Sequence, residues 1–197
     1  MVNLLSNKEE FLRVQGFLNN KKSKKRYDWN IGSMKLMPTE LYANKEITVG
    51  GGKVALLKGS SVRLTGTTNF DGNKLEDGRI AVIDGVAIHI AIGDKNKPSH
   101  SVDFTKNVLP PAFNYANLTL KQNDEVLIKL PITSILNGAE GFDGNYRDLG
   151  AYSLILDKHA VELEIEFPDD VTPPTLDAGK SIHVSTIFRG FETYIKR

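Results

Sequence analysis

The stretch from Gly78 to Gly93 constrains the fold of this chain more than any other. Its branched apolar residues recur at every second position, and the dipeptide Asp84-Gly85 interrupts them near the middle. A period of two is typical of a β-strand, because successive side chains of a strand point to opposite faces of a sheet. We therefore interpret the stretch as the central strand of a β-sandwich, or as two strands that meet at a bulge. We expect it to act as scaffold.

Further stretches have the same strand-like pattern, set off by Gly, Asn, Asp and Pro. They are 46–49, 53–58, 61–66, 117–121, 125–132, 152–157, 160–167 and 181–189. In the segment Val161–Phe167, Glu162, Glu164 and Glu166 alternate with apolar residues, so we predict that they face solvent. No long helix recurs between the strands, which excludes a doubly wound α/β fold. The fold class predicted is all-β: an antiparallel β-sandwich, a single jelly roll of about eight strands with a short N-terminal helix.

The N-terminal region predicts that helix. Ser6-Asn7-Lys8-Glu9 fits a capping box, and apolar residues at helical spacing follow it, so we place an amphipathic helix over 7–19. Val14 fits the apolar face less well than the others. The interface face consists of Phe11, Leu12, Phe17 and Leu18. A helix this short is marginal alone, so we expect it to dock on the body or on a neighbouring chain.

Positive charge is concentrated directly after this helix. The basic arm consists of Lys21, Lys22, Lys24, Lys25 and Arg26. Residues 1–26 hold seven Lys or Arg against two Glu, a net charge of +5, whereas the remaining 18 basic and 22 acidic residues give −4. Two interpretations stay open: a solvated linker, or contacts to nucleic-acid phosphates that carry no sequence readout. We divide the chain into 1–40, the N-terminal helix and basic arm, and 41–197, the β-sandwich domain.

Residues for catalysis or metal binding are not indicated. The chain has no cysteine, so a disulfide framework and a thiolate zinc site are excluded. The histidines are His89, His100, His159 and His183, and none forms a pair at metal-ligand spacing. The chain also lacks the Gly-x-Ser-x-Gly elbow of hydrolases. We therefore predict no catalytic residues, no metal, no cofactor and no enzymatic activity.

Three turns have residue types that occur in ligand-binding loops. We interpret all three as turns without a bound ligand. The run Gly50–Gly52 looks like a phosphate loop, but a strand follows it where a phosphate-binding helix would have to begin. Weak calcium sites at Asp71/Asp77 or Asp143/Asp148 stay open, although calcium prefers six to eight oxygen ligands. The long loops 94–111 and 137–149 are of a length that usually serves contacts with partners.

A short helix and a basic arm ahead of a jelly-roll-like body resemble the coat and virion structural proteins of viruses and bacteriophages. The segments that carry this resemblance are Thr68–Arg79, Leu127–Ile132 and Phe188–Arg197. The resemblance implies a capsid subunit that self-assembles through its loops and its N-terminal arm, with the basic arm facing the particle interior or a neighbouring subunit. It implies as partners further copies of the chain, other virion proteins and non-specific nucleic acid. The expected location is the virion, assembled in the host cytoplasm.

Two other classes of function stay open. A carbohydrate- or ligand-binding β-sandwich module predicts a concave face that bears Trp29, Tyr115, Tyr146 or Tyr152. A jelly-roll metalloenzyme of cupin type predicts that His89, His183 and a carboxylate converge. Since no run approaches the ~18 apolar residues of a membrane helix, we expect no membrane span. The N-terminus turns acidic where a signal peptide would become apolar, so a protein outside a virion is expected in the cytoplasm.

Overall fold

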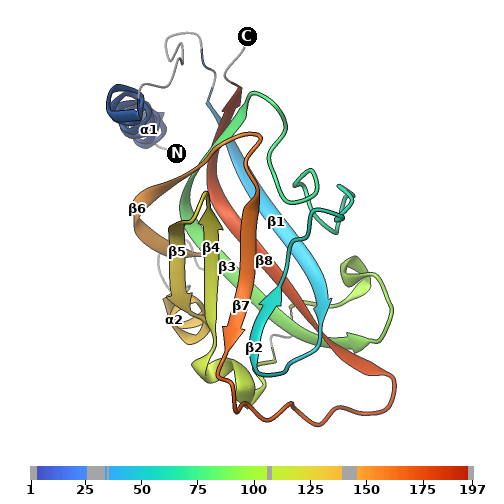
Figure 1. The fold of residues 1–197 in the computed structure, drawn as a ribbon. Coiled ribbons are helices and arrows are strands. Elements are labelled where there is room, and N and C mark those ends of the chain that lie inside the picture. Colours follow the sequence, from blue (N-terminus) through green and yellow to red (C-terminus); the bar gives the residue numbers. More distant parts are fainter. Residues whose placement is uncertain (1–3, 26–33, 35, 106–107, 139–145, 195–197) are drawn as a thin grey trace.

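Two four-stranded antiparallel sheets pack face to face in the computed structural model, which describes residues 4–25, 34, 36–105, 108–138 and 146–194 (Figure 1). Sheet A has the order β1-β8-β3-β6, with bounds Met37–Ile47, Lys180–Tyr194, Arg79–Asp94 and Arg147–Ile155. Sheet B has the order β2-β7-β4-β5, with bounds Gly52–Ala55, Val161–Phe167, Asn117–Gln122 and Glu125–Pro131. The helices are α1 Leu4–Lys25 and α2 Ile132–Gly138, and the 3₁₀ turns are η2 Ser99–Ser101 and η3 Pro111–Tyr115.

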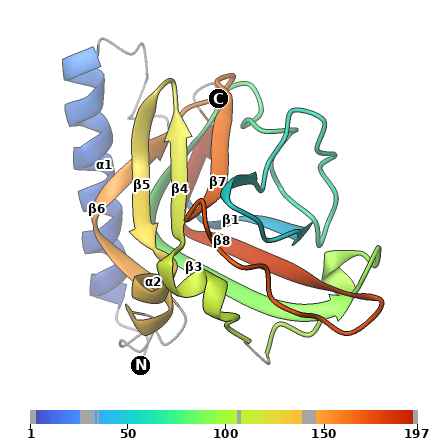
Figure 2. The ribbon, with the colours of Figure 1, turned by 60° about the horizontal axis from the view of Figure 1, so that its bottom comes forward.

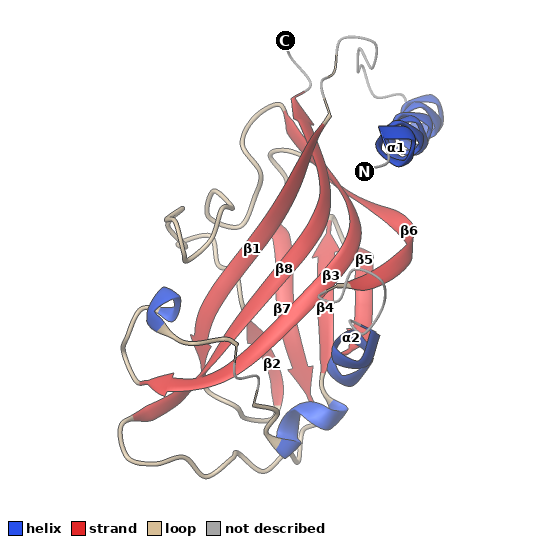
Figure 3. Cartoon of the chain, turned by 180° about the vertical axis from the view of Figure 1, so that it is seen from behind, coloured by secondary structure: helices blue, strands red, loops and turns tan. Residues whose placement is uncertain are grey.

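The strand order is that of a jelly roll. The first strand pairs with the last, β2 with β7, β3 with β6 and β4 with β5, all antiparallel. Such pairing arises when one long antiparallel hairpin rolls up so that alternate strand pairs enter opposite sheets. Figure 3 shows the four strands of sheet A crossing in front of those of sheet B. The predicted all-β sandwich with an N-terminal helix is confirmed.

The stretch 78–93 forms β3, an interior strand of sheet A that pairs with β8 and β6. The strand register shifts between Ile83 and Gly85, so the predicted bulge is confirmed. The extra residue exchanges the two faces of the strand. Ala81 and Ile83 point into the sandwich before the bulge, whereas Val86, Ile88 and Ile90 do so beyond it.

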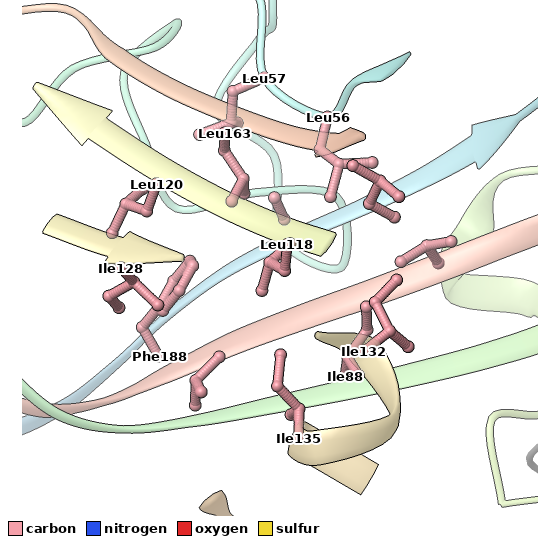
Figure 4. Close-up of a cluster of buried hydrophobic side chains, with 14 of the residues drawn as sticks. Leu56, Leu57, Ile88, Leu118, Leu120, Ile128, Ile132, Ile135, Leu163 and Phe188 are labelled. Atoms are coloured by element: carbon pink, nitrogen blue, oxygen red, sulfur yellow. The ribbon is translucent and has the colours of Figure 1, made fainter. Parts of the chain in front are cut away.

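Apolar side chains from both sheets fill the space between them (Figure 4). Leu118 and Leu163 of sheet B lie opposite Ile88 and Phe188 of sheet A, and all four are buried. Helix α2 closes one end of this core with the buried Ile132 and Ile135, among other residues. Burial on this scale, at roughly 25 cal/mol per Å² of apolar surface, is the main force that holds the two sheets together.

Several predicted boundaries are wrong. Strand β1 begins at Met37, ahead of the predicted strand 46–49. Polar residues and Pro38 hide its alternation, and proline is tolerated because β1 is an edge strand. The segment 61–66 is a loop, although it alternates, because the free edge of β1 is already bonded by residues 67–69. Helix α1 runs through Lys25 rather than ending at Asn19, since lysine is a good helix former.

Candidate functional site

Helix α1 lies against the outer face of sheet A, beside β6 (Figure 2). We call its contact surface on the sheet the helix seat. The seat consists of the buried Ile80, Val82 and Leu154, with Leu36, Tyr152, Leu156 and Phe191 around them. Val14 and Leu18 of α1 are almost completely buried on it, and the Phe17 ring meets Tyr152 edge to face at 5.5 Å. The predicted helix therefore docks on the body.

The predicted interface face is rotated relative to the one that α1 uses. Leu18 is buried and Phe11 and Phe17 are partly buried, but Leu12 is 53% exposed and points away from the seat. Val14, which fits the predicted face less well, is completely buried. Apolar and polar residues separate only weakly onto opposite sides of α1, so its sequence alone does not decide which stripe faces the sheet.

The basic arm is the C-terminal part of this same helix. Lys21, Lys22 and Lys24 lie on α1, and the Lys21 ammonium is 5.4 Å from the centroid of the Phe17 ring, within cation–π range. Lys25 is the last residue of α1, and Arg26 lies outside the described residues. The interpretation of residues 21–25 as a linker is therefore wrong. The structure combines the apolar docking stripe and the basic charges in one rigid element.

A polar network crosses the outer face of sheet A next to the helix seat. Arg189 of β8 stands at its centre: its Nε donates to Asp84 Oδ1 at 2.9 Å, and Nη2 donates to Asp148 Oδ1 at 3.3 Å. The guanidinium also lies 5.3 Å from the ring of Tyr146, whose hydroxyl donates to Glu40 at 2.5 Å. Burial raises the pKa of Asp84, and the neighbouring Arg189 only partly offsets this effect.

Helix α1 contacts the sheet beside this network through Glu10, whose carboxylate accepts from the Tyr152 hydroxyl. Burial and the hydrogen bond to Glu10 raise the Tyr152 pKa well above its usual range, so the phenol stays protonated. Between α1 and this network runs a groove of about 990 Å³. Its charged side chains have partners: Glu10 lies 3.6 Å from Arg13, and Arg189 contacts both nearby aspartates. The groove thus lies beside the contacts that attach α1 to sheet A.

Both strand histidines lie on the outer side of sheet A. His183 is fully buried beneath η2, with Nδ1 3.2 Å from Ser99 Oγ and Nε2 3.2 Å from the Asp94 carbonyl oxygen. A carbonyl can only accept, so Nε2 carries a proton and donates it to the Asp94 carbonyl oxygen. His89 lies on β3 opposite Ser185, two residue pairs along the sheet from His183. Burial lowers the pKa of His89. Among the described residues, no three His, Asp or Glu side chains are grouped as a metal site.

The described tyrosines that were considered for a sugar-binding face have different surroundings. Tyr152 donates to Glu10 of α1, Tyr146 donates to Glu40 of β1, and Tyr115 is exposed on η3 in the β3–β4 connector. Trp29 lies outside the described residues.

Acidic residues of the two turns considered as calcium sites form ion pairs with lysine and arginine side chains. Asp77 pairs with Lys158 at 2.8 Å, and Glu76 pairs with Arg63. Asp71 closes its own turn through its backbone, bonding Lys74. Of the second turn, Asp148 binds Arg189, while Asp143 lies outside the described residues.

The run Gly50–Gly52 has a packing role that the sequence did not reveal. A Cβ on Gly51 would lie 2.3 Å from the carbonyl oxygen of Asp169. Only glycine therefore lets the backbone of the β7–β8 connector pack this closely against the turn. As predicted, strand β2 follows the run where a phosphate-binding helix would have to begin.

The outer face of sheet B is covered by charged pairs. Glu164 lies 3.0 Å from Lys53 and 3.4 Å from Lys121, and Glu166 lies 3.2 Å from Lys129. The apolar residues that alternate with these glutamates are buried in the core, so the prediction for Val161–Phe167 is confirmed.

None of the described helices is long and apolar enough to cross a membrane. The sequence matches no protein-family model, and it matches no curated protein. Function has to be inferred from the jelly-roll body, from α1 and from the loops.

Proposed function

We propose that the chain is a structural subunit of a virion shell, a coat or capsid protein that associates with copies of itself. The observation that carries the proposal is a jelly-roll strand order around an interior packed with apolar side chains. Jelly rolls of two sheets occur mainly in viral capsid proteins, in lectin domains and in cupins. The distribution of functional side chains favours the first of these three classes.

A cupin-type enzyme would need its metal ligands inside the roll. Here His89 and His183 lie on the outer side of sheet A, and His183 uses both ring nitrogens for hydrogen bonds to Ser99 and Asp94. A sugar-binding module would need aromatic rings on one open face. Tyr152 instead donates to Glu10 of α1, and Tyr146 donates to Glu40 of β1.

A shell subunit needs a stiff body and surfaces that other copies can contact. The two sheets supply the body, and the β2–β3 and β3–β4 connectors supply long surface loops. Helix α1 places Lys21, Lys22 and Lys24 together at the end of an element that packs on the body through Val14 and Leu18. We propose that these lysines face the particle interior, where they would contact nucleic-acid phosphates without reading sequence.

The proposal is tested by light scattering and electron microscopy of the purified full chain over a range of concentration and salt. We expect concentration-dependent assemblies with a regular outline, such as shells or rings. A chain that stays strictly monomeric under all these conditions would overturn the proposal.

A further inference from the structure

Strand β1 lies at one edge of sheet A, where it pairs with β8. It is the longest of the four edge strands of the described sheets, with 11 residues against 4 in β2, 7 in β5 and 9 in β6. The backbone N–H and C=O groups along the edge of a sheet can pair with a strand of another chain. A long edge offers more such groups, so β1 is the edge of this sandwich that most needs a cover.

A short stretch of the β2–β3 connector, residues 66–69, covers the edge of β1. We call this stretch the edge guard. In Figures 1 and 3 the connector runs beside the edge of β1 that faces away from β8. The Asn44 N–H donates to the Thr67 carbonyl oxygen at 2.7 Å, and the Thr68 hydroxyl donates to the Tyr42 carbonyl oxygen at 2.8 Å. The guard thus bonds the backbone of β1 where a neighbouring strand would otherwise do so.

Asn69 is the residue of the guard that most closely imitates a strand. Its Oδ1 accepts from the Tyr42 N–H at 2.8 Å, and its Nδ2 donates to the Glu40 carbonyl oxygen at 2.7 Å. A side-chain amide carries a donor and an acceptor, as a peptide group does. Glu40, Tyr42 and Asn44 are alternate residues, and in an antiparallel sheet alternate residues direct both backbone groups to the same side. The guard therefore occupies three successive outward-facing positions of β1.

The outward-facing positions at the two ends of β1 have further obstacles to pairing. Pro38 comes two residues before Glu40 and has no N–H to donate. Glu46 comes two residues after Asn44, and its carboxylate accepts from the Asn96 N–H at 2.9 Å. This bond attaches the turn that follows β3 to the end of β1.

The edge guard is anchored on the body of the protein. Phe70, the residue after it, is completely buried in the core. The Gly66 N–H donates to the Tyr42 hydroxyl at 3.1 Å, and a Cβ on Gly66 would lie 2.7 Å from the Cβ of His100. The guard is thus fixed at both of its ends.

We infer that the edge guard is a built-in block to strand addition: it keeps β1 from pairing with strands of other chains, including other copies of this one. The inference goes beyond the proposed function, because it identifies a contact between chains that the fold prevents. It also restricts any self-association of the wild type to other surfaces.

The full chain with Thr68→Val and Asn69→Ala tests the block. The two changes leave the Tyr42 N–H and the carbonyl oxygens of Glu40 and Tyr42 without their side-chain partners. We expect the concentration at which the chain dimerises, measured by sedimentation velocity, to fall at least about tenfold relative to the wild type. If the double variant does not fold, Asn69→Ala alone must lower this concentration at least about threefold.

The matched control is Asn73→Ala. The Asn73 Nδ2 also donates to a backbone carbonyl, that of Val161 at 3.3 Å, but Val161 belongs to the interior strand β7. This change should alter the dimerisation concentration less than about twofold, because it frees no group on a sheet edge.

A further substitution separates strand addition from association through partial unfolding. Glu40→Pro, added to the unguarded chain, removes an outward-facing N–H from β1 and leaves the ladder with β8 in place, as Pro38 does. We expect it to bring the dimerisation concentration back towards that of the wild type. Partial unfolding would not be reversed by proline.

Two results would overturn the inference: an unguarded chain that dimerises no more readily than Asn73→Ala, or dimerisation that Glu40→Pro does not reduce. A wild type that stays monomeric under all conditions would overturn the proposed function and leave the edge guard in force.

Discussion

The outer face of sheet A is apolar where α1 covers it, whereas the outer face of sheet B carries lysine and glutamate pairs. Both sheets present the same kind of apolar face to the interior, so the sandwich alone does not explain the difference. A sheet face such as that of Glu164 and Lys53 is stable in water. A face such as that of Ile80 and Val82 needs a cover, and α1 provides it.

The two outer faces also differ in energy. Burying a side chain such as Val14 or Leu18 contributes about 1.5–3 kcal/mol. An exposed ion pair such as Lys129–Glu166 contributes much less, because water and salt screen its charges. The outer face of sheet A therefore binds α1, whereas the outer face of sheet B is exposed to water. Under the proposed self-association, contacts between copies are accordingly expected at loops and at α1 rather than on sheet B.

The largest effect is expected at the bulge that turns β3 and sets the outer face of sheet A. A Cβ on Gly190 would lie 1.9 Å from the carbonyl oxygen of Val82, so Gly190→Ala must separate β8 from β3. We expect a loss of at least about 3 kcal/mol in unfolding free energy, measured by urea denaturation. The control Gly16→Ala has open space around it on α1 and should be neutral or stabilising by up to about 1 kcal/mol. Equal effects of the two variants would show that β3 and β8 can separate without cost.

Next in size is the attachment of α1 to the helix seat. Leu18→Ala removes a buried side chain and should cost about 2–5 kcal/mol of docking free energy, seen as faster hydrogen exchange throughout α1. Leu12→Ala makes the same chemical change on the exposed side of the helix, and should stay within about 0.5 kcal/mol. If Leu12→Ala accelerated hydrogen exchange in α1 more than Leu18→Ala, α1 would have to dock through the side that carries Leu12.

The dependence of stability on pH should have opposite signs on the two faces. Burial raises the folded-state pKa of Asp84, so its favourable contribution is complete below the unfolded pKa and is lost as the pH rises through the folded pKa. Lys129 lowers the pKa of Glu166, so its contribution is present above the unfolded pKa and is lost as the pH falls through the folded pKa.

Urea unfolding of the wild type, Asp84→Asn and Glu166→Gln at a series of pH values from acid to neutral measures both effects. With rising pH, the stability of the wild type should fall relative to Asp84→Asn and rise relative to Glu166→Gln. Parallel curves for Asp84→Asn and the wild type would mean that Arg189 compensates fully for the burial of Asp84.

The smallest effect is expected from a single ion pair of sheet B. Lys129→Gln should change the unfolding free energy by no more than about 1 kcal/mol, and the change should shrink at 1 M salt because the pair is exposed. A loss above about 2 kcal/mol that persists in salt would show that this face is buried in an assembly, and would remove the contrast with sheet A.

The strands with clean alternation could be predicted because their signal is local. Val161–Phe167 and the stretch around Asp84-Gly85 show a period of two that any sheet must respect, and the bulge follows from one interrupted period. The loop 61–66 shows the same alternation and is no strand, since a strand also needs a free neighbouring edge. Strand β1 shows the converse case. Its residues alternate poorly between apolar and polar, yet it is a strand because its backbone pairs with β8 along its whole length.

The candidate site could not be predicted, because its partners are distant in the chain. Glu10 meets Tyr152, and Arg189 meets Asp84, more than a hundred positions away in each case. The importance of Gly51 likewise depends on Asp169 of another connector. The sequence by itself determined an all-β sandwich with a bulged central strand, and a short N-terminal helix followed by a run of basic residues. Only the tertiary structure decided which stripe of α1 is buried and which sheet face it covers, because these choices depend on contacts between remote segments.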